Sequence, residues 1–247
     1  MDLLHLIKFK LVINMQIMEY IESLTDVCGI ADLNKDNKKL IKTYGKDICK
    51  YPYAIVIGHK MNEDIIETIP LTYNDDKLAK KYNDEYYNSH KRASNIAKKI
   101  NNYIQNEGYD GIILDVSGKS DEINLKQSFS NKASAHIAGV GWLGKNNLLT
   151  TKEFGPRLTW VTILTNAPLG EYTGVEMESL CDECTLCVNA CPGNAIVDLP
   201  DPSKSYSPEK CGKYIMSRRD EGHPMACGMC LYICPYGNNK SRKILEK

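Results

Sequence analysis

The chain has 247 residues, of which 31 are Lys or Arg and 31 are Asp or Glu, so its formal net charge at pH 7 is zero. No basic stripe marks a nucleic-acid footprint, and nucleic acid is therefore not expected as a partner. The length allows one large domain and a small appended one, and a hydrophobic content of 43% suits the core of an ordinary globular protein.

The first segment, residues 1–20, is rich in apolar side chains. Four charged residues interrupt it: Asp2, Lys8, Lys10 and Glu19. We predict an amphipathic helix here, because the apolar run is too broken for a secretory signal or a membrane span. A cytoplasmic protein without a membrane partner is expected. Met15 and Met18 are alternative starts, since the prefix before them carries no functional signal.

Apolar runs then alternate with charged, helix-like stretches as far as about residue 174. Buried strands are predicted over residues 53–58, 111–116 and 158–164. Helices are predicted over residues 76–107 and 131–137. This order is typical of an α/β domain, and the remaining residues are expected to form short helices and tight turns.

Eight of the ten cysteines lie between Cys181 and Cys234, in two sets that each end in a proline. The first set has the spacing C-x-x-C-x-x-C-x-x-x-C-P of a two-cluster ferredoxin, in which the fourth cysteine ligates the other cluster. One 4Fe-4S cluster is therefore assigned to tetrad one, which is Cys181, Cys184, Cys187 and Cys234. The other cluster is assigned to tetrad two, which is Cys191, Cys211, Cys227 and Cys230.

Two other uses of these cysteines compete with the clusters. Disulfides need an oxidising compartment, for which the sequence gives no signal. Structural zinc takes two separated C-x-x-C pairs, often with histidine, and a proline after the fourth cysteine is not a feature of such sites. Cys28 and Cys49 have no partner at ligand spacing, so we predict that they are buried apolar thiols.

Residues 139–145, GVGWLGK, fit the pattern G-x-G-x-x-G and loosely fit a phosphate loop. A dinucleotide fingerprint follows a strand and opens a helix, whereas this stretch follows a helical pattern and precedes an extended one. A phosphate loop needs Ser or Thr after its lysine, and this chain has Asn146 there. Nucleotide binding is therefore not expected.

The same stretch has a better interpretation. Residues 132–149, followed by EFGPR at 153–157 and LTNAPL at 164–169, resemble the epoxyqueuosine reductase family. Those enzymes and the related corrinoid reductive dehalogenases carry an A-G-x-G-W-x-G-K-x-x-L-L signature ahead of a double 4Fe-4S module. The resemblance extends to CGIA at residues 28–31, to the run YAIVIG and to the region around Tyr86 and His90, so it covers most of the chain.

This resemblance implies an α+β fold class with three parts. They are an α/β, nitroreductase-like domain over residues 1–174, a double 4Fe-4S ferredoxin-like domain over 175–240 and a tail over 241–247. It also implies cobalamin, held by the α/β domain and reduced by electrons that pass from cluster to cluster. By local match, the cobalamin contacts fall on Leu149, Trp160, Arg219 and Ala226. Ordinary core packing is the alternative role for Leu149 and Trp160.

The chain departs from the family at the proton donor. The tRNA-modifying members have an acidic residue in a V-D-[ST]-A-P element, and that position falls on Leu125 here. Asp121 or Glu122 would substitute only in a rebuilt loop, so the catalytic residue is unassigned. The dehalogenases use a tyrosine instead. Three tyrosines near His90 are predicted to lie on a partly exposed helix face, namely Tyr82, Tyr86 and Tyr87.

These features predict an oxygen-sensitive iron-sulfur oxidoreductase that reduces a small-molecule substrate at cobalamin. A ferredoxin or flavodoxin is the expected electron donor. The alternatives are a ferredoxin-like electron carrier and a reductase that reactivates the corrinoid of a partner protein. Epoxyqueuosine in tRNA is a less expected substrate, because the charge is neutral, the family's acid is missing and only 13 residues follow Cys234, where many tRNA-acting members carry a helical-repeat tail.

Overall fold

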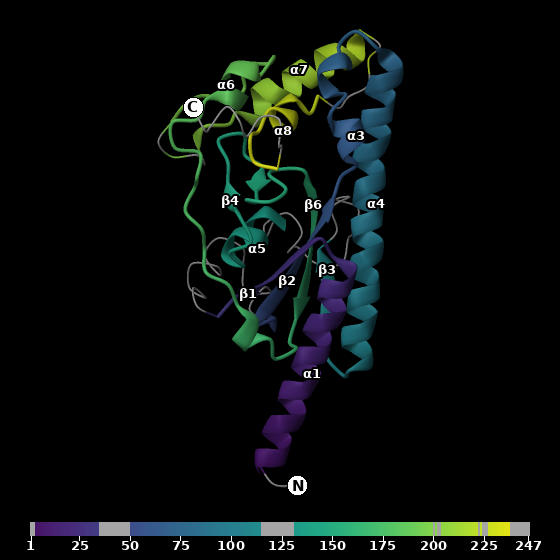
Figure 1. Cartoon of the computed structure of the whole chain (residues 1–247), viewed down its shortest axis with the longest axis vertical. Helices are drawn as coiled ribbons and strands as arrows, with labels where there is room; N and C mark the ends of the chain where they lie inside the picture. The colour runs from purple at the N-terminus through teal and green to yellow at the C-terminus, as the bar shows by residue number, and fades with distance from the viewer. Residues whose placement is uncertain are drawn as a thin grey trace. The chain divides into compact units, whose positions relative to one another are not determined.

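A computed structural model describes most of the chain (Figure 1). The described residues are 3–34, 50–114, 131–199, 201, 204–221, 223 and 227–237. Contacts divide the chain into two compact units. The sheet unit comprises residues 1–59, 91–140 and 160–176. The cluster unit comprises residues 60–90, 141–159 and 177–247, so it includes two segments that precede residue 174.

Four strands form the main sheet in the order β1-β2-β6-β3. Their bounds are β1 Val27–Asp32, β2 Tyr53–Lys60, β3 Gly111–Leu114 and β6 Leu158–Thr165. Strand β1 pairs antiparallel with β2, with Cys28 opposite Ile57, and β3 pairs antiparallel with β6, with Ile113 opposite Ile163. The three strands predicted from apolar runs are confirmed, although residues 115 and 116 lie outside the described part of the chain.

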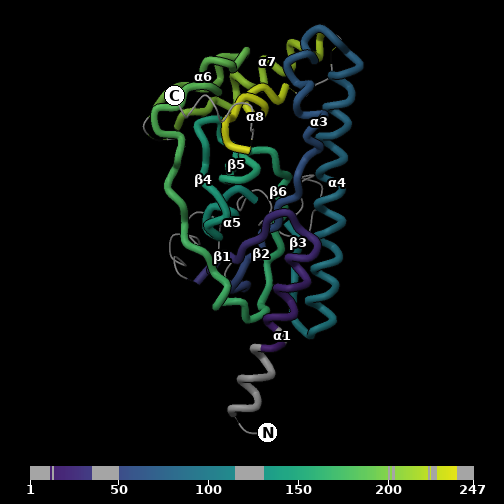
Figure 2. The backbone as a smooth tube through the Cα atoms, in the orientation of Figure 1, coloured from purple at the N-terminus to yellow at the C-terminus, as the bar shows by residue number. Residues whose placement is uncertain are grey.

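The core of the sheet unit lies where helices pack on one face of this sheet. Alternate residues of β2 and β6, including Ile57 and Val161, meet the apolar faces of α1 (Leu3–Leu24) and α4 (Asp76–Asn106). Helix α4 buries Ala93, Ala97, Ile100 and Ile104. The helical period read from the sequence is therefore confirmed, and the tube in Figure 2 follows α4 without a break.

Short elements build the cluster unit around a second, smaller core. They are α3 (Glu63–Ile66), the 3-10 helix η2 (Ile69–Leu71), β4 (Trp142–Leu143), β5 (Leu149–Thr150), α6 (Leu186–Ala190), α7 (Pro208–Asp220) and α8 (Met229–Tyr232). The core joins Ile66 and Ile69 to Tyr82 of α4 and Leu231 of α8. None of the helices in the described part of the chain is long and apolar enough to cross a membrane.

Candidate iron-sulfur site

The glycine motif, residues 139–145, leads into a β-hairpin and forms its first strand. Helix α5 (Asn131–Ile137) precedes it, and β4 and β5 pair antiparallel with Trp142 opposite Thr150. A Cβ atom on Gly141 would clash with the backbone oxygen of Thr150, so the glycine permits the close approach of the two strands. The order of helix followed by strands, predicted from the sequence, is confirmed. It is the reverse of a dinucleotide fingerprint.

All four cysteines of tetrad one line a single cavity in the cluster unit. The hairpin supplies Gly144, Lys145, Asn146 and Thr150 to its wall. Burial raises the pKa of Cys187 to about 11 and that of Cys234 to about 12, and the neighbouring cysteines of the same tetrad add to both shifts. A compensating cation favours the thiolate form of these two side chains, and a bound iron cluster would supply one.

The pKa of one member of tetrad two, Cys230, shows that the other three members lie nearby. The pKa of Cys230 is raised first by burial and then by Cys227, Cys187, Cys211 and Cys191. Three of these four belong to tetrad two. The fourth, Cys187, lies on α6 and connects the two tetrads through Cys230 on α8. The crossed ligand assignment made from the spacing stays a prediction.

The thiols surround a space and do not converge on a point. Within the described residues, no group of three or more His, Cys, Asp or Glu side chains is close enough to hold a single metal ion. No described cysteine forms a disulfide. A cubane needs its four ligands spread around a cube, and the four cysteines of tetrad one line the wall of one cavity.

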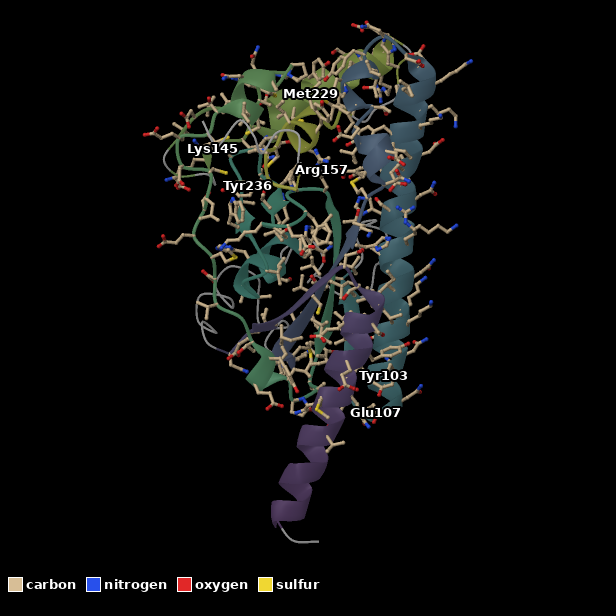
Figure 3. The ribbon with its side chains drawn as sticks, in the orientation of Figure 1. Tyr103, Glu107, Lys145, Arg157, Met229 and Tyr236 are labelled. Carbon is tan, nitrogen blue, oxygen red and sulfur yellow. The ribbon has the colours of Figure 1, made fainter. Side chains whose placement is uncertain are left out.

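Lys145 at the hairpin tip holds the first cysteine loop (Figure 3). Its side chain is only 5% exposed. The ammonium donates to the carbonyl oxygen of Asp182 at 2.6 Å and to that of Cys184 at 3.2 Å, and it pairs with the Asp198 carboxylate at 2.5 Å. Sequence reasoning placed Lys145 in the glycine signature but assigned it no contact, whereas the structure makes it a positioning residue for tetrad one.

The neighbouring Asn146 holds the second cysteine segment. Its amide nitrogen donates to the carbonyl oxygen of Cys230 at 3.1 Å. Its amide oxygen accepts from the backbone N–H of Leu148 at 3.1 Å, which fixes the tip of the hairpin. One hairpin therefore contacts both tetrads, and this explains physically why the G-K-N sequence accompanies two cysteine sets that lie far along the chain.

Replacing Lys145 by Met is expected to destabilise the reconstituted protein by about 2 kcal/mol, because two loop carbonyls and a carboxylate lose their shared donor. Iron content should also fall, since the loop of tetrad one is no longer held. Urea unfolding and iron analysis measure both effects. Lys213→Met is the matched control, because Lys213 is 75% exposed and pairs only with Glu209 of its own helix. Equal behaviour of the two variants would contradict the role given to Lys145.

The four residues predicted to contact cobalamin differ in burial and in the element that carries them. Leu149 is buried on β5 of the cluster unit, and Trp160 is 8% exposed on β6 in the sheet unit, where its ring packs against Gly58. The indole Nε1 of Trp160 is buried and has no hydrogen-bond partner among the described residues. Arg219 is exposed on α7 and pairs with Asp220 at 3.0 Å. Ala226 lies outside the described residues.

The positions considered for the unassigned proton donor also have distinct outcomes. Leu125, Asp121 and Glu122 lie outside the described residues. Tyr86 and Tyr87 are 43% and 59% exposed, as expected for a helix face. The prediction for Tyr82 is wrong, because it is only 3% exposed and packs in the small core of the cluster unit.

Tyr82 is buried because a glycine lies against its hydroxyl. Gly228, the residue before α8, has φ +69°, and a Cβ atom there would clash with the Tyr82 ring and hydroxyl. Tyr82 therefore packs beside the backbone that joins Cys227 to Cys230. The other predicted buried group, Cys28, is partly buried against the main core, and burial raises its pKa. Cys49 lies outside the described residues.

Comparison with known proteins first defines a class. Residues 175–197 match the family described as "4Fe-4S binding domain", so the chain carries an iron-sulfur region of ferredoxin type.

The particular relatives are epoxyqueuosine reductases. The Listeria monocytogenes enzyme is 31% identical over 117 residues, which is 43% of this chain and 29% of the relative. The Bacillus subtilis enzyme is 27% identical over 141 residues, 51% of this chain and 35% of the relative. The resemblance predicted from the sequence is confirmed, and the chain spans about a third of the length of these relatives.

Solved structures show the same fold. An epoxyqueuosine reductase from Bacillus subtilis aligns with 94% of this chain and 67% of its own, with a TM-score of 0.61 and 18% identity. A catabolic reductive dehalogenase aligns with 92% of this chain and 33% of its own, with a TM-score of 0.69 and 20% identity. The predicted fold class, an α/β domain with a ferredoxin-like region, is thereby confirmed.

Two further solved relatives concern partners. One is an epoxyqueuosine reductase crystallised with an epoxyqueuosine-modified tRNA stem loop, and it covers 94% of this chain with a TM-score of 0.61. Another is a reductive dehalogenase whose structure suggests a mechanism for B12-dependent dehalogenation, and it aligns with a TM-score of 0.69. The expectation that nucleic acid is not a partner is not supported by the first of these relatives.

Proposed function

We propose that the protein is an oxidoreductase that passes electrons through two 4Fe-4S clusters to a bound cobalamin, where a small substrate is reduced. The observation that carries this proposal is the proximity of the two cysteine sets, because Cys234 of the second set lines one cavity with the first three cysteines of the first set, and Cys187 is near enough to Cys230 to raise its pKa. Two clusters held by interleaved ligands lie close enough for rapid transfer of single electrons. The expected donor is a low-potential protein such as a ferredoxin or a flavodoxin.

The residues of the cluster unit fit this role. Tetrad one would hold one cluster in its cavity, whose wall includes Leu186, Pro235 and Tyr236. Lys145 would place a positive charge beside that cluster, and it already opposes the upward shift of the Cys187 pKa. Burial and a nearby cation both affect cluster potential, so these residues would tune electron transfer as well as bind iron.

Trp160 supports the cobalamin part of the proposal. A buried indole N–H usually finds an acceptor, and that of Trp160 has none among the described residues. Cobalamin, when bound, would supply chemistry at cobalt that amino-acid side chains do not provide. Leu149, which is 2% exposed, would offer an apolar contact. Arg219, already paired with Asp220 on an exposed helix, is the weaker candidate.

Anaerobic reconstitution with iron, sulfide and cobalamin, followed by desalting and metal analysis, tests the proposal. About eight irons and about one cobalt per chain are expected. Eight irons without cobalt would make the protein an electron carrier. A reaction only in the presence of a separate corrinoid protein would make it a reactivating reductase.

Replacing Trp160 by Ala is expected to reduce the retained cobalt more than the iron. Trp160→Phe keeps most of the packing area and removes the N–H, so it should weaken cobalamin binding by about 1 kcal/mol, roughly a fivefold rise in Kd. Cobalt and iron are measured on the same sample. If both metals fall in proportion, Trp160 is a core residue and not a cofactor contact.

A second candidate function is the reduction of epoxyqueuosine in tRNA, because a structural relative was crystallised with such a stem loop. Binding of the same modified stem loop by the reconstituted protein, measured against the unmodified stem loop, tests this candidate. If the modified RNA binds more tightly than the unmodified RNA, epoxyqueuosine in tRNA becomes the favoured substrate in place of a small molecule.

A further inference from the structure

The tyrosines around tetrad two have no role in the function proposed above. Tyr73 and Tyr206 come from separate segments of the cluster unit, and each places its hydroxyl on a cysteine of this tetrad. Neither residue belongs to the cysteine motifs or to the glycine signature. Their hydrogen bonds therefore need an explanation of their own.

The contact of Tyr73 is the clearest. Its hydroxyl oxygen lies 3.3 Å from the Sγ atom of Cys227. In a free thiol either atom is able to donate the proton. A thiolate bound to iron has no proton, so Tyr73 must be the donor once the cluster is present. The hydrogen bond is then directed at a cluster ligand.

The surroundings of Tyr73 hold its ring in place. The guanidinium of Arg218 on α7 lies over the ring, 4.9 Å from its centroid. Arg218 also donates to the carbonyl oxygen of Thr72 at 3.5 Å, next to Tyr73 in the chain. His223 pairs with Asp76 at 2.8 Å and fastens the end of α7 to the same segment. The orientation of Tyr73 is thus built into the cluster unit.

Tetrad two receives two further hydrogen bonds. The hydroxyl of Tyr206 bonds to Cys211, and the backbone N–H of Ala195 donates to the Sγ atom of Cys191 at 3.3 Å. A β-bridge between Tyr206 and Ile196 fixes this part of the chain. Three of the four sulfurs in tetrad two therefore have a hydrogen-bond partner.

Tetrad one has a different environment. Tyr236 lines its cavity, but the hydroxyl of Tyr236 donates to the carbonyl oxygen of Leu180 at 3.1 Å and not to a thiol. The charged residue in the wall of this cavity is Lys145. The polar side chains beside the two tetrads therefore differ, because an ammonium lies beside tetrad one and two phenol hydroxyls bond to cysteines of tetrad two.

We propose that Tyr73 and Tyr206 are positioning residues that raise the reduction potential of the cluster held by tetrad two. The cluster accepts one electron from a low-potential donor, and the added negative charge spreads onto its sulfur ligands. A phenol that donates to such a sulfur stabilises the reduced state more than the oxidised state. This inference rests on the two-cluster part of the proposed function.

Redox titration followed by electron paramagnetic resonance tests the inference on the reconstituted full chain. In Tyr73→Phe one of the two cluster potentials should become more negative, and in Tyr206→Phe the same cluster should shift in the same direction. The double variant should show about the sum of the two shifts, while the other potential stays at its wild-type value. Tyr103→Phe is the control, because it removes a phenol hydroxyl from the sheet unit (Figure 3).

Iron analysis before each titration separates the possible failures. About eight irons per chain with both potentials unchanged in Tyr73→Phe and Tyr206→Phe would overturn the tuning role and leave the two-cluster assignment intact. A wild-type protein with far fewer irons would overturn the cluster assignment itself. Arg218→Lys serves as a second test. It keeps the charge but loses the planar group over Tyr73, and it should shift the same potential in the same direction as Tyr73→Phe.

Discussion

The Cys184→Ala variant should retain about four irons per chain, where the wild-type protein should retain about eight. Cys184 lines the cavity of tetrad one, and its backbone N–H donates to the carbonyl oxygen of Cys181 at 2.7 Å. Loss of this ligand opens one corner of the cubane and leaves Cys187 and Cys234 as crowded thiols with raised pKa values. Cluster binding and folding are coupled in such sites, so the unit should also unfold more easily.

Two comparisons make this result specific. Cys28→Ala removes a cysteine of the sheet unit and should leave the iron count unchanged. Cys234→Ala should abolish the same spectroscopic signal as Cys184→Ala, although Cys234 belongs to the second cysteine set in the sequence. If Cys234→Ala and Cys227→Ala instead abolish one signal together, the crossed assignment is wrong. An unchanged count of about eight irons in Cys184→Ala would refute the cluster assignment.

Local pattern was sufficient for much of the fold. The apolar runs in β2 and β6 alternate with long helices, and their spacing carries the information directly. The distance along the chain between cysteines also decides which corners of a cube they reach, and the four cysteines grouped as tetrad one do line one cavity. In both cases, residues that act together lie near one another in the sequence or in a repeated motif.

The contacts that support the site were not predictable in this way. Tyr73 meets Cys227 across 154 positions of the chain, and Lys145 reaches Asp182 across 37. No periodicity connects such pairs, because tertiary packing alone brings them together. Tyr82 shows the same limit. A polar stretch of helix predicted exposure, and a glycine next to α8 instead provided a site in which the ring is buried.

Arg157 is the other supporting residue that sequence reasoning missed, and it appeared only as part of the EFGPR resemblance. Its side chain is 3% exposed. Figure 3 labels it. One guanidinium nitrogen, Nη1, pairs with Glu63, the first residue of α3. The same nitrogen pairs at 3.3 Å with Glu67, which follows the last residue of α3. The other, Nη2, donates to the carbonyl oxygen of Tyr232 at 3.0 Å. Arg157 therefore connects α3 to the helix that carries Cys230.

Replacing Arg157 by Met should destabilise the protein by about 3 kcal/mol, because its removal leaves two carboxylates and a partly buried carbonyl without their buried partner. Arg157→Lys should cost less, since it keeps the charge, but it loses the planar fork that serves two directions at once. The urea midpoint of the reconstituted protein measures both changes.

Lys80→Met is the matched control for this comparison. Lys80 pairs with Asp84 one helical turn away, and its side chain is 73% exposed, so the loss of that pair should cost at most about 0.5 kcal/mol. A midpoint for Arg157→Met equal to that of Lys80→Met would show that the buried pair contributes nothing. A lower urea midpoint for Arg157→Met with full iron content would show that Arg157 stabilises the unit without being needed to assemble the clusters.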